Sequence, residues 1–180
     1  MKSIKEMSMM ELGGYLCDAL LAQDISVVLS GGSCVEIYSR GEYTSYDLDL
    51  INQYNTQFKK IKSVMERLGF KEKSRYFVHQ ETHLFVEFPS GPLGVGDAPV
   101  SEIAHIETEA GVLRLLTPTD CIKDRLAAYY HWNDEQSLQQ AVWVAQQNPF
   151  DRDNIEVWST KENAQTKFKK FVKTLDEMQK

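Results

Sequence analysis

Two carboxylates occupy alternate positions of one apolar segment, Tyr-Asp-Leu-Asp-Leu-Ile at 46–51. Alternate side chains of a strand point to the same face, so Asp47 and Asp49 stand side by side while Leu48 and Leu50 face a core. Two such anions repel each other unless a cation lies between them, and Mg²⁺ takes carboxylate oxygens together with substrate phosphates. This pattern indicates metal-dependent phosphoryl or nucleotidyl transfer. The alternative interpretation is a solvated strand edge without a ligand.

A glycine-serine turn precedes the paired acids. The β-branched, apolar run at 25–29 predicts a buried strand that ends at Gly31 and Gly32, and Ser33 can cap a short helix over 34–38. Glycines let the backbone approach a phosphate closely, and a helix N-terminus offers free N–H groups to an anion. An ordinary strand-to-helix turn is the alternative. The turn and the paired acids together indicate a site more strongly than either does alone, because the two must meet in space to form it.

The segment from Gly31-Gly32-Ser33 to Asp47-Leu48-Asp49 resembles the signature of the polymerase β-type nucleotidyltransferases. Within that superfamily the chain resembles the small bacterial proteins near the AbiE abortive-infection toxins, over roughly residues 25–145. The resemblance implies an α+β fold, with a nucleotidyltransferase-like mixed sheet flanked by helices and a C-terminal helical region. It implies catalytic and metal-binding roles for Asp47 and Asp49, and triphosphate binding by Gly31, Gly32 and Ser33.

The resemblance also calls for a third carboxylate on a later strand. Glu87 is the candidate, as the one acid of the apolar run 84–88. An unpaired charge in such a strand is costly unless it finds a partner such as a metal. Alternation puts Glu87 and Phe85 on one face, which is either the site or open water. Asp97, in the loop 89–97 rich in proline and glycine, is a weaker candidate because it lies on mobile backbone.

A fourth element begins with a helix-start pattern at Thr117. Thr117 suits the N-cap, Pro118 the first helical position and Asp120 the first turn. The resemblance implies that Lys123, further along this helix, faces the triphosphate, and lysine is a compact cation suited to phosphate. The alternative is a solvated helix face with Lys123 exposed.

Hydrophobic periodicity predicts the organisation around these motifs. We expect a nucleotidyltransferase-like core at 1–116 and a helical region packed on it at 117–180, or one single domain. The expected elements are a first helix over 4–22, a basic helix over 55–68, a hairpin of 75–79 with 84–88, a second hairpin around 109–111, and a last helix within 161–180.

Composition narrows the class of protein. The 180 residues are 42% hydrophobic and 26% charged, which is ordinary for a globular chain. The net charge of −6 disfavours a broad electrostatic grip on nucleic acid, so no DNA partner is expected, and basic runs such as Lys59, Lys60 and Lys62 are either RNA contacts or a solvated face. Three scattered cysteines and the lack of a long apolar run predict a cytoplasmic protein without a membrane partner.

The predicted function is transfer of a nucleoside monophosphate from an NTP to an acceptor hydroxyl, with two Mg²⁺ ions. The acceptor is open: RNA such as tRNA, a protein, or a small molecule. The resemblance adds a toxin role with a cognate antitoxin. The competing hypothesis is a non-catalytic nucleotidyltransferase-fold protein that binds or regulates a partner.

Overall fold

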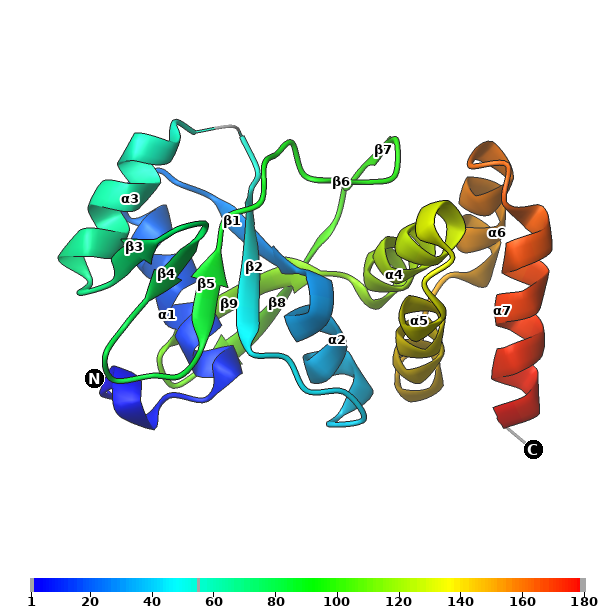
Figure 1. Ribbon diagram of the computed structural model, residues 1–180, viewed down its shortest axis with the longest axis horizontal. Coiled ribbons are helices and arrows are strands. Elements are labelled where there is room, and N and C mark those ends of the chain that lie inside the picture. The colour runs from blue at the N-terminus through cyan, green and yellow to red at the C-terminus, as the bar shows by residue number, and fades with distance from the viewer. Residues whose placement is uncertain (1, 55, 179–180) are drawn as a thin grey trace.

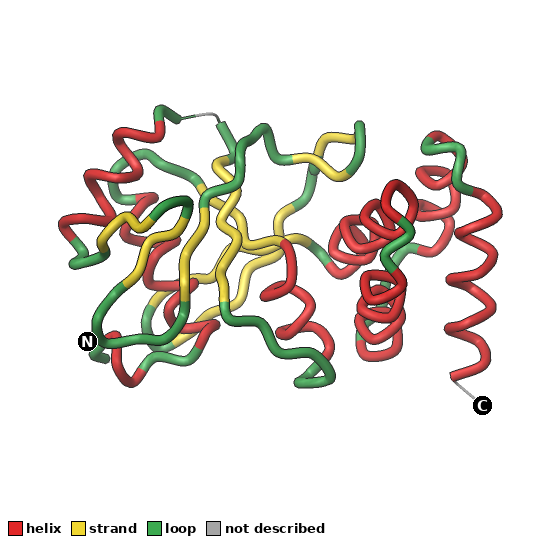
Figure 2. The backbone as a smooth tube through the Cα atoms, in the orientation of Figure 1, coloured by secondary structure: helices red, strands yellow, loops and turns green. Residues whose placement is uncertain are grey.

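The computed structural model describes residues 2–54 and 56–178 and shows an α+β fold, as the sequence predicts. The sheet and the helices packed against it fill one half of the molecule, and the four C-terminal helices fill the other (Figures 1 and 2). The elements, in order, are a 3₁₀ helix Ile4–Glu6, α1 Met9–Leu21, β1 Val27–Ser30, α2 Gly31–Ser39, β2 Asp47–Asn52, α3 Phe58–Arg67, β3 Lys71–Lys73, β4 Tyr76–Val78, β5 Phe85–Glu87, β6 Gly94–Val95, β7 Ala98–Pro99, β8 Ile103–Thr108, β9 Gly111–Leu116, α4 Pro118–Trp132, α5 Glu135–Gln147, α6 Arg152–Lys161 and α7 Gln165–Met178.

The strands form one mixed sheet in the order β3-β4-β5-β2-β1-β9-β8, and β6 and β7 form a separate small hairpin. β2 lies near the middle, antiparallel to β1 and parallel to β5. Both expected hairpins are confirmed, as β4 with β5 and β8 with β9. β3, which the sequence did not predict, extends the first of these hairpins at the sheet edge.

Burial alternates along β2, so one face of the sheet is core and the other carries the acids. Leu48 and Leu50 are fully buried. A Cβ on Gly13 of α1 would lie 3.4 Å from a methyl carbon of Leu48, which places α1 on the face opposite Asp47 and Asp49. α3 covers the same core face, since its Phe58 ring packs 6.0 Å from Phe77 of β4. The acids therefore lie on the face that α1 and α3 leave uncovered.

The first helix differs from its prediction. A single helix over 4–22 was expected, but the chain forms a short 3₁₀ turn and then α1. The break has a local cause: Ser8 and Glu11 form a capping box, in which each side chain accepts the other's backbone N–H. The basic helix α3 is shorter than expected, and Asn55, where it was predicted to begin, lies outside the described residues.

The C-terminal helices pack on α2 and on the β6–β7 hairpin. Asn148, after α5, donates to the Tyr38 carbonyl of α2 at 2.8 Å. Glu162, at the end of α6, accepts from the backbone N–H of Asp97 at 3.3 Å and lies 3.0 Å from His131 of α4. The division into units at residue 116 stays a prediction. Across the described ranges, no helix combines the length and the apolar character that a membrane span requires.

Candidate functional site

Three carboxylates from two adjacent strands converge on the open face of the sheet. β2 pairs with β5 in parallel, and the register sets Asp49 directly beside Glu87. One oxygen from each of Asp47, Asp49 and Glu87 lies within 4.8 Å of the others, and among the described residues no other three potential metal ligands gather in this way. We call these three residues the acidic cluster. The structure thus brings together the three acids that the sequence predicted as metal ligands.

The acidic cluster concentrates negative charge that the neighbouring cations offset only in part. Burial, and then the charges of Asp47 and Glu87, raise the pKa of Asp49 from 3.8 to about 7. A carboxyl group in this state binds a proton unless a cation replaces it. Three carboxylate oxygens at this spacing fit a hard divalent cation such as Mg²⁺, which prefers oxygen ligands.

Ser45 orients the first acid of the cluster. Its hydroxyl donates to a carboxylate oxygen of Asp47 at 2.7 Å, and its backbone N–H donates to the carboxylate of Glu36 in α2 at 2.5 Å. Ser45 is 5% exposed, and both bonds are partly buried. The sequence analysis missed Ser45 and Glu36, because a hydrogen bond across nine residues leaves no periodic pattern.

The two glycines lie where a side chain would collide with the site. Gly31 has φ +64°, and a Cβ there would lie 2.1 Å from a carboxylate oxygen of Asp49. A Cβ on Gly32 would lie 3.2 Å from the Ser45 hydroxyl and from the Tyr43 ring. The glycines therefore let the start of α2 lie directly against the acidic cluster. The N–H groups of a helix's first turn have no partners within the helix and can bind an anion.

Ser33 does not lie as predicted. α2 begins at Gly31 with Ser30 as its N-cap, three residues earlier than the sequence indicated, so Ser33 is inside the helix. Its side chain is fully buried, and its hydroxyl lies 3.3 Å from the Ser30 carbonyl, to which it donates. The N-cap role predicted for Ser33 is thus wrong, while its part in binding the triphosphate stays a prediction. The backbone at Gly31 and Gly32 is the part of the turn that borders the cluster.

The helix-start prediction at Thr117 is confirmed, since its hydroxyl accepts the N–H of Asp120 at 3.2 Å. Lys123 is not solvated: it is 8% exposed, and its Nζ lies 3.2 Å from a carboxylate oxygen of Asp120. It lines a hollow of about 500 Å³ together with Ala98 of β7 and Val157 of α6. Asp47, Asp49 and Glu87 do not line this hollow.

Two neighbours on α4 influence the acidic cluster instead. Arg125 lowers the pKa of Asp49 and Asp124 raises it, which places both charges within range of that carboxyl group. Arg125 and Asp124 form an ion pair, and Arg125 also donates to Gln140 of α5 at 3.4 Å. The sequence analysis named only Lys123 of this helix, because a helical pattern does not show which polar side chain turns toward a distant strand.

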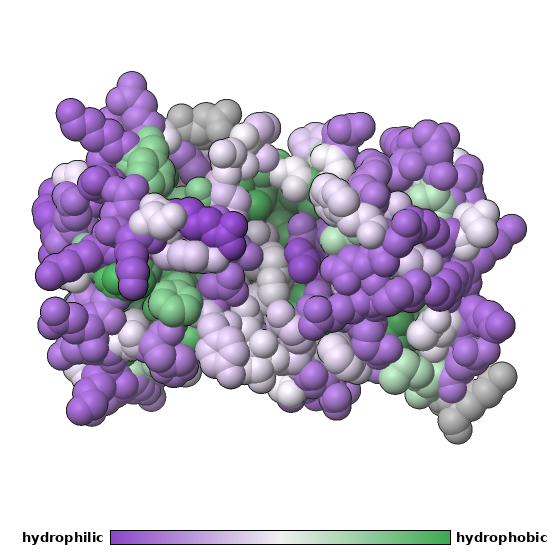
Figure 3. All heavy atoms as spheres, viewed as in Figure 1, coloured by the Kyte–Doolittle hydropathy of each residue, from purple (hydrophilic) through white to green (hydrophobic). Residues whose placement is uncertain are grey.

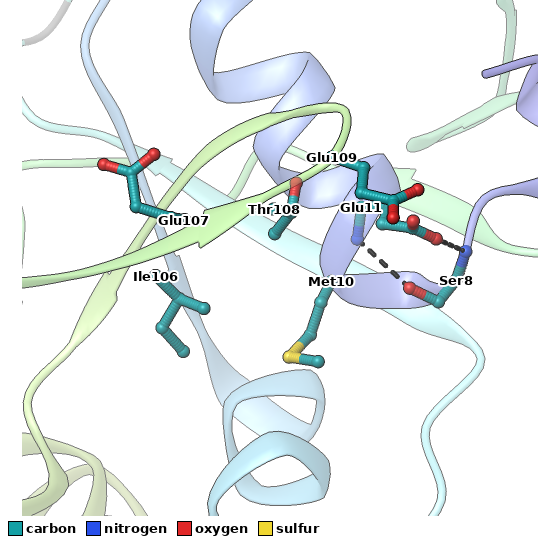
Figure 4. Close-up of a pocket in the computed structure, with 7 residues that line it drawn as sticks. All are labelled: Ser8, Met10, Glu11, Ile106, Glu107, Thr108 and Glu109. Atoms are coloured by element: carbon teal, nitrogen blue, oxygen red, sulfur yellow. Dashed lines mark hydrogen bonds between the residues drawn. The ribbon is translucent and has the colours of Figure 1, made fainter. Parts of the chain in front are cut away.

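Other candidate positions lie outside this site. Asp97 is exposed in the β6–β7 turn and is absent from the acidic cluster. A hollow of about 570 Å³ lies between the start of α1 and the β8–β9 hairpin (Figure 4). Glu11, which lines this hollow, accepts hydrogen bonds from the Ser8 backbone N–H and from Lys2, both at 2.7 Å. The bond from Ser8 caps α1, so Glu11 has a structural role there.

Comparison with known proteins agrees with the fold. No protein-family model and no curated protein matches the chain. Among solved structures, an antigenic nucleotidyltransferase-like protein from Paracoccidioides brasiliensis is similar with a TM-score of 0.56 at 12% identity, over 75% of this chain and 74% of that one. This likeness shows a nucleotidyltransferase-like fold.

The antibiotic-resistance factor ANT(2'')-Ia is also similar. Its solution structure has a TM-score of 0.47 at 14% identity, over 92% of this chain and 93% of that one. Its crystal structure with adenylyl-2''-tobramycin has a TM-score of 0.48 at 14% identity, over 87% of this chain and 94% of that one.

Proposed function

We propose that this chain is a metal-dependent nucleotidyltransferase that moves a nucleoside monophosphate from an NTP to an acceptor hydroxyl. The observation that carries the proposal is the acidic cluster, with three carboxylates beside a glycine-bordered helix N-terminus. The nucleotidyltransferase-like fold supports it. A toxin role with a cognate antitoxin belongs to the same hypothesis and rests on the sequence resemblance alone.

The residues divide the work of an in-line displacement. Asp47, Asp49 and Glu87 would hold two divalent cations, which supply charge stabilisation at the attacking and leaving oxygens. The backbone N–H groups at Gly31 and Gly32 would bind triphosphate oxygens. The acceptor oxygen forms a bond to the α-phosphorus, and the bond from that phosphorus to the bridging oxygen breaks. Pyrophosphate leaves with the electron pair, and Glu87 accepts the hydroxyl proton.

Lys123 keeps in this proposal the role that the resemblance implied, as a cation for the triphosphate. Its partner Asp120 and the adjoining hollow place it between α4 and the β6–β7 hairpin. We propose that it neutralises a part of the nucleotide only if the triphosphate extends from the cluster into that hollow. Arg125 acts on the acids directly, because its positive charge lowers the pKa of Asp49.

Calorimetry tests the proposal directly. Each of the four ribonucleoside triphosphates is titrated into the full chain with Mg²⁺, and the same titrations are repeated with Asp47→Asn/Asp49→Asn. We expect binding of at least one NTP by the wild type and its loss in the double variant. Asp176→Asn, an exposed acid on α7, is the matched control and should bind as the wild type does. No binding by a folded wild type would favour the non-catalytic hypothesis.

A further inference from the structure

The acidic cluster lies at one end of a sheet face that continues across β5, β4 and β3. Residues paired on neighbouring strands point to the same face of a sheet. Glu87 pairs with Tyr76 of β4, and Tyr76 in turn pairs with Lys73 of β3. Lys71 pairs with Val78 in the same way, so it shares the face. Neighbouring strands lie about 4.8 Å apart, which makes the face from β2 to β3 about 14 Å wide, enough for a few nucleotides.

Two aromatic rings form the middle of this face. Phe85 is directly beside Asp47 in the register and is 42% exposed, while its neighbour Val86 is fully buried on the other side. The Phe85 and Tyr76 rings lie 5.7 Å apart between centroids. We call these two rings the aromatic shelf. Figure 3 shows hydrophobic atoms exposed among hydrophilic ones over β4 and β5, on the face seen in Figure 1.

Two lysines of β3 border the aromatic shelf on the side away from β2, and an arginine lies between the shelf and the acidic cluster. Lys71, Lys73 and Arg75 are all exposed, and we call them the cation strip. The Arg75 guanidinium lies 4.7 Å from the Tyr76 ring centroid, and its Nε lies 3.6 Å from a carboxylate oxygen of Glu87. A metal ion at the acidic cluster would take over the neutralisation of Glu87, which leaves Arg75 available to an anionic ligand.

Taken across the strands from β2 to β3, the face presents acids suited to a metal, then flat rings, then two lysines, with Arg75 beside Glu87 and Tyr76. We propose that it binds the 3′ end of a single-stranded RNA, which is the acceptor of the transfer; this rests on the proposed nucleotidyltransferase function. Bases stack on the aromatic shelf, phosphates pair with the cation strip, and the terminal ribose hydroxyl lies at the acidic cluster. Stacking rings combined with cations is the general mode of single-strand binding.

The charges on this face favour that acceptor class over a polycationic small molecule. Lys71, Lys73 and Arg75 would repel a cationic acceptor as it approached from the sheet edge, and they attract an anionic one. The face also lies opposite α3, whose lysines the sequence suggested as an RNA contact. The net charge of −6 does not oppose the proposal, since the three cations are grouped beside the site.

The test is fluorescence anisotropy with a 5′-fluorescein single-stranded RNA of about ten nucleotides, within the site sizes of single-strand binders. The full chain is titrated with Mg²⁺ present and NTP absent. We expect Phe85→Ala to weaken binding about tenfold, in line with the loss of one stacked base. We expect Lys73→Ala to lower the salt slope of log K by about 0.7, which is the loss of one phosphate contact.

Two matched variants control for general effects. Trp132→Ala removes an aromatic ring that is 76% exposed on α4, and Lys60→Ala removes an exposed lysine from α3 on the opposite face of the sheet. Both should bind the RNA as the wild type does. Equal losses in Phe85→Ala and Trp132→Ala, or no RNA binding by the wild type, would overturn the inference.

Calorimetry with NTP on the same preparation tests the nucleotidyltransferase function separately from the RNA acceptor. NTP binding without RNA binding overturns the acceptor assignment and leaves the proposed function standing. Absence of NTP binding refutes the function, whatever the RNA result. Loss of NTP binding in Phe85→Ala would also overturn the inference, because the aromatic shelf would then serve the donor.

Discussion

Replacing Asp49 with asparagine should stabilise the metal-free protein at pH 8. Asp49 is half-buried between two other carboxylates, and its pKa is raised from 3.8 to about 7 by burial first and then by the charges of Asp47 and Glu87. The folded state therefore resists ionisation of this group. Asparagine has nearly the same shape and carries no charge, so it removes the cost.

The direction and size of the effect follow from proton linkage. Because the folded-state pKa lies above the unfolded one, the stability contributed by the protonated Asp49 is fully present below about pH 4 and is lost as the pH rises to about 7. A difference of this size corresponds to at most ~4 kcal/mol. The amide leaves a partly buried donor without a partner, which costs about 1–3 kcal/mol. We therefore expect a net gain of about 1–3 kcal/mol at pH 8.

Urea unfolding in EDTA, at pH 4 and at pH 8, measures this gain. Asp49→Asn should be more stable than the wild type at pH 8 and less stable at pH 4, where only the cost of the unpartnered amide remains, with equal denaturant slopes. Asp176→Asn, which removes the same charge from exposed α7, should match the wild type at both values. Mg²⁺ should then stabilise the wild type and leave Asp49→Asn little changed. If Asp49→Asn is destabilised at pH 8 without metal, the acidic cluster carries no unbalanced charge and the reasoning is refuted.

Three further predictions concern the residues around the site. Gly31→Ala should lower the free energy of unfolding by about 1–3 kcal/mol more than Gly41→Ala in urea titrations, since both positions have positive φ but only the first would press a Cβ against Asp49. Ser45→Ala should weaken Mg²⁺ binding about 10- to 100-fold in calorimetry with little change in stability, and unchanged affinity would exclude an orienting role. Glu162→Ala should speed amide hydrogen exchange in the β6–β7 turn while exchange in β8 and β9 stays as in the wild type, because this carboxylate joins the turn to the helices.

The sequence was sufficient for the acids because a strand has a simple period. Alternation at 46–51 predicted that Asp47 and Asp49 share one face, and burial along β2 alternates as expected. Glu87 was found through the resemblance, and its place beside Asp49 depends on a parallel register that no local pattern encodes. The strand order across the sheet, and the extra edge strand β3, were likewise decided by tertiary pairing.

The turn and the helix that follow the sheet show where local patterns stop being informative. Gly31-Gly32 was predicted as the turn that ends the first strand, but the close approach to Asp49 makes glycine necessary at Gly31, the first residue of α2. On α4, the cap at Thr117 was predictable from residue types, whereas the direction of Lys123 was not. That side chain pairs with Asp120 and faces α6 and β7 because packing of α4 sets its rotation.

The same contrast bears on the choice of acceptor. The lysines of α3 are adjacent along the chain and were therefore visible as a basic run, yet α3 lies on the core face opposite the acidic cluster. The cations of β3 and its turn are separated by acidic and polar residues, and only strand pairing places Lys73 beside Tyr76 and Tyr76 beside Glu87. A charge acts on a ligand through its distance and not through its sequence position. If the chain transfers a nucleotide to RNA, the strand-edge cations are the ones that must contribute, and substitutions on α3 should be silent.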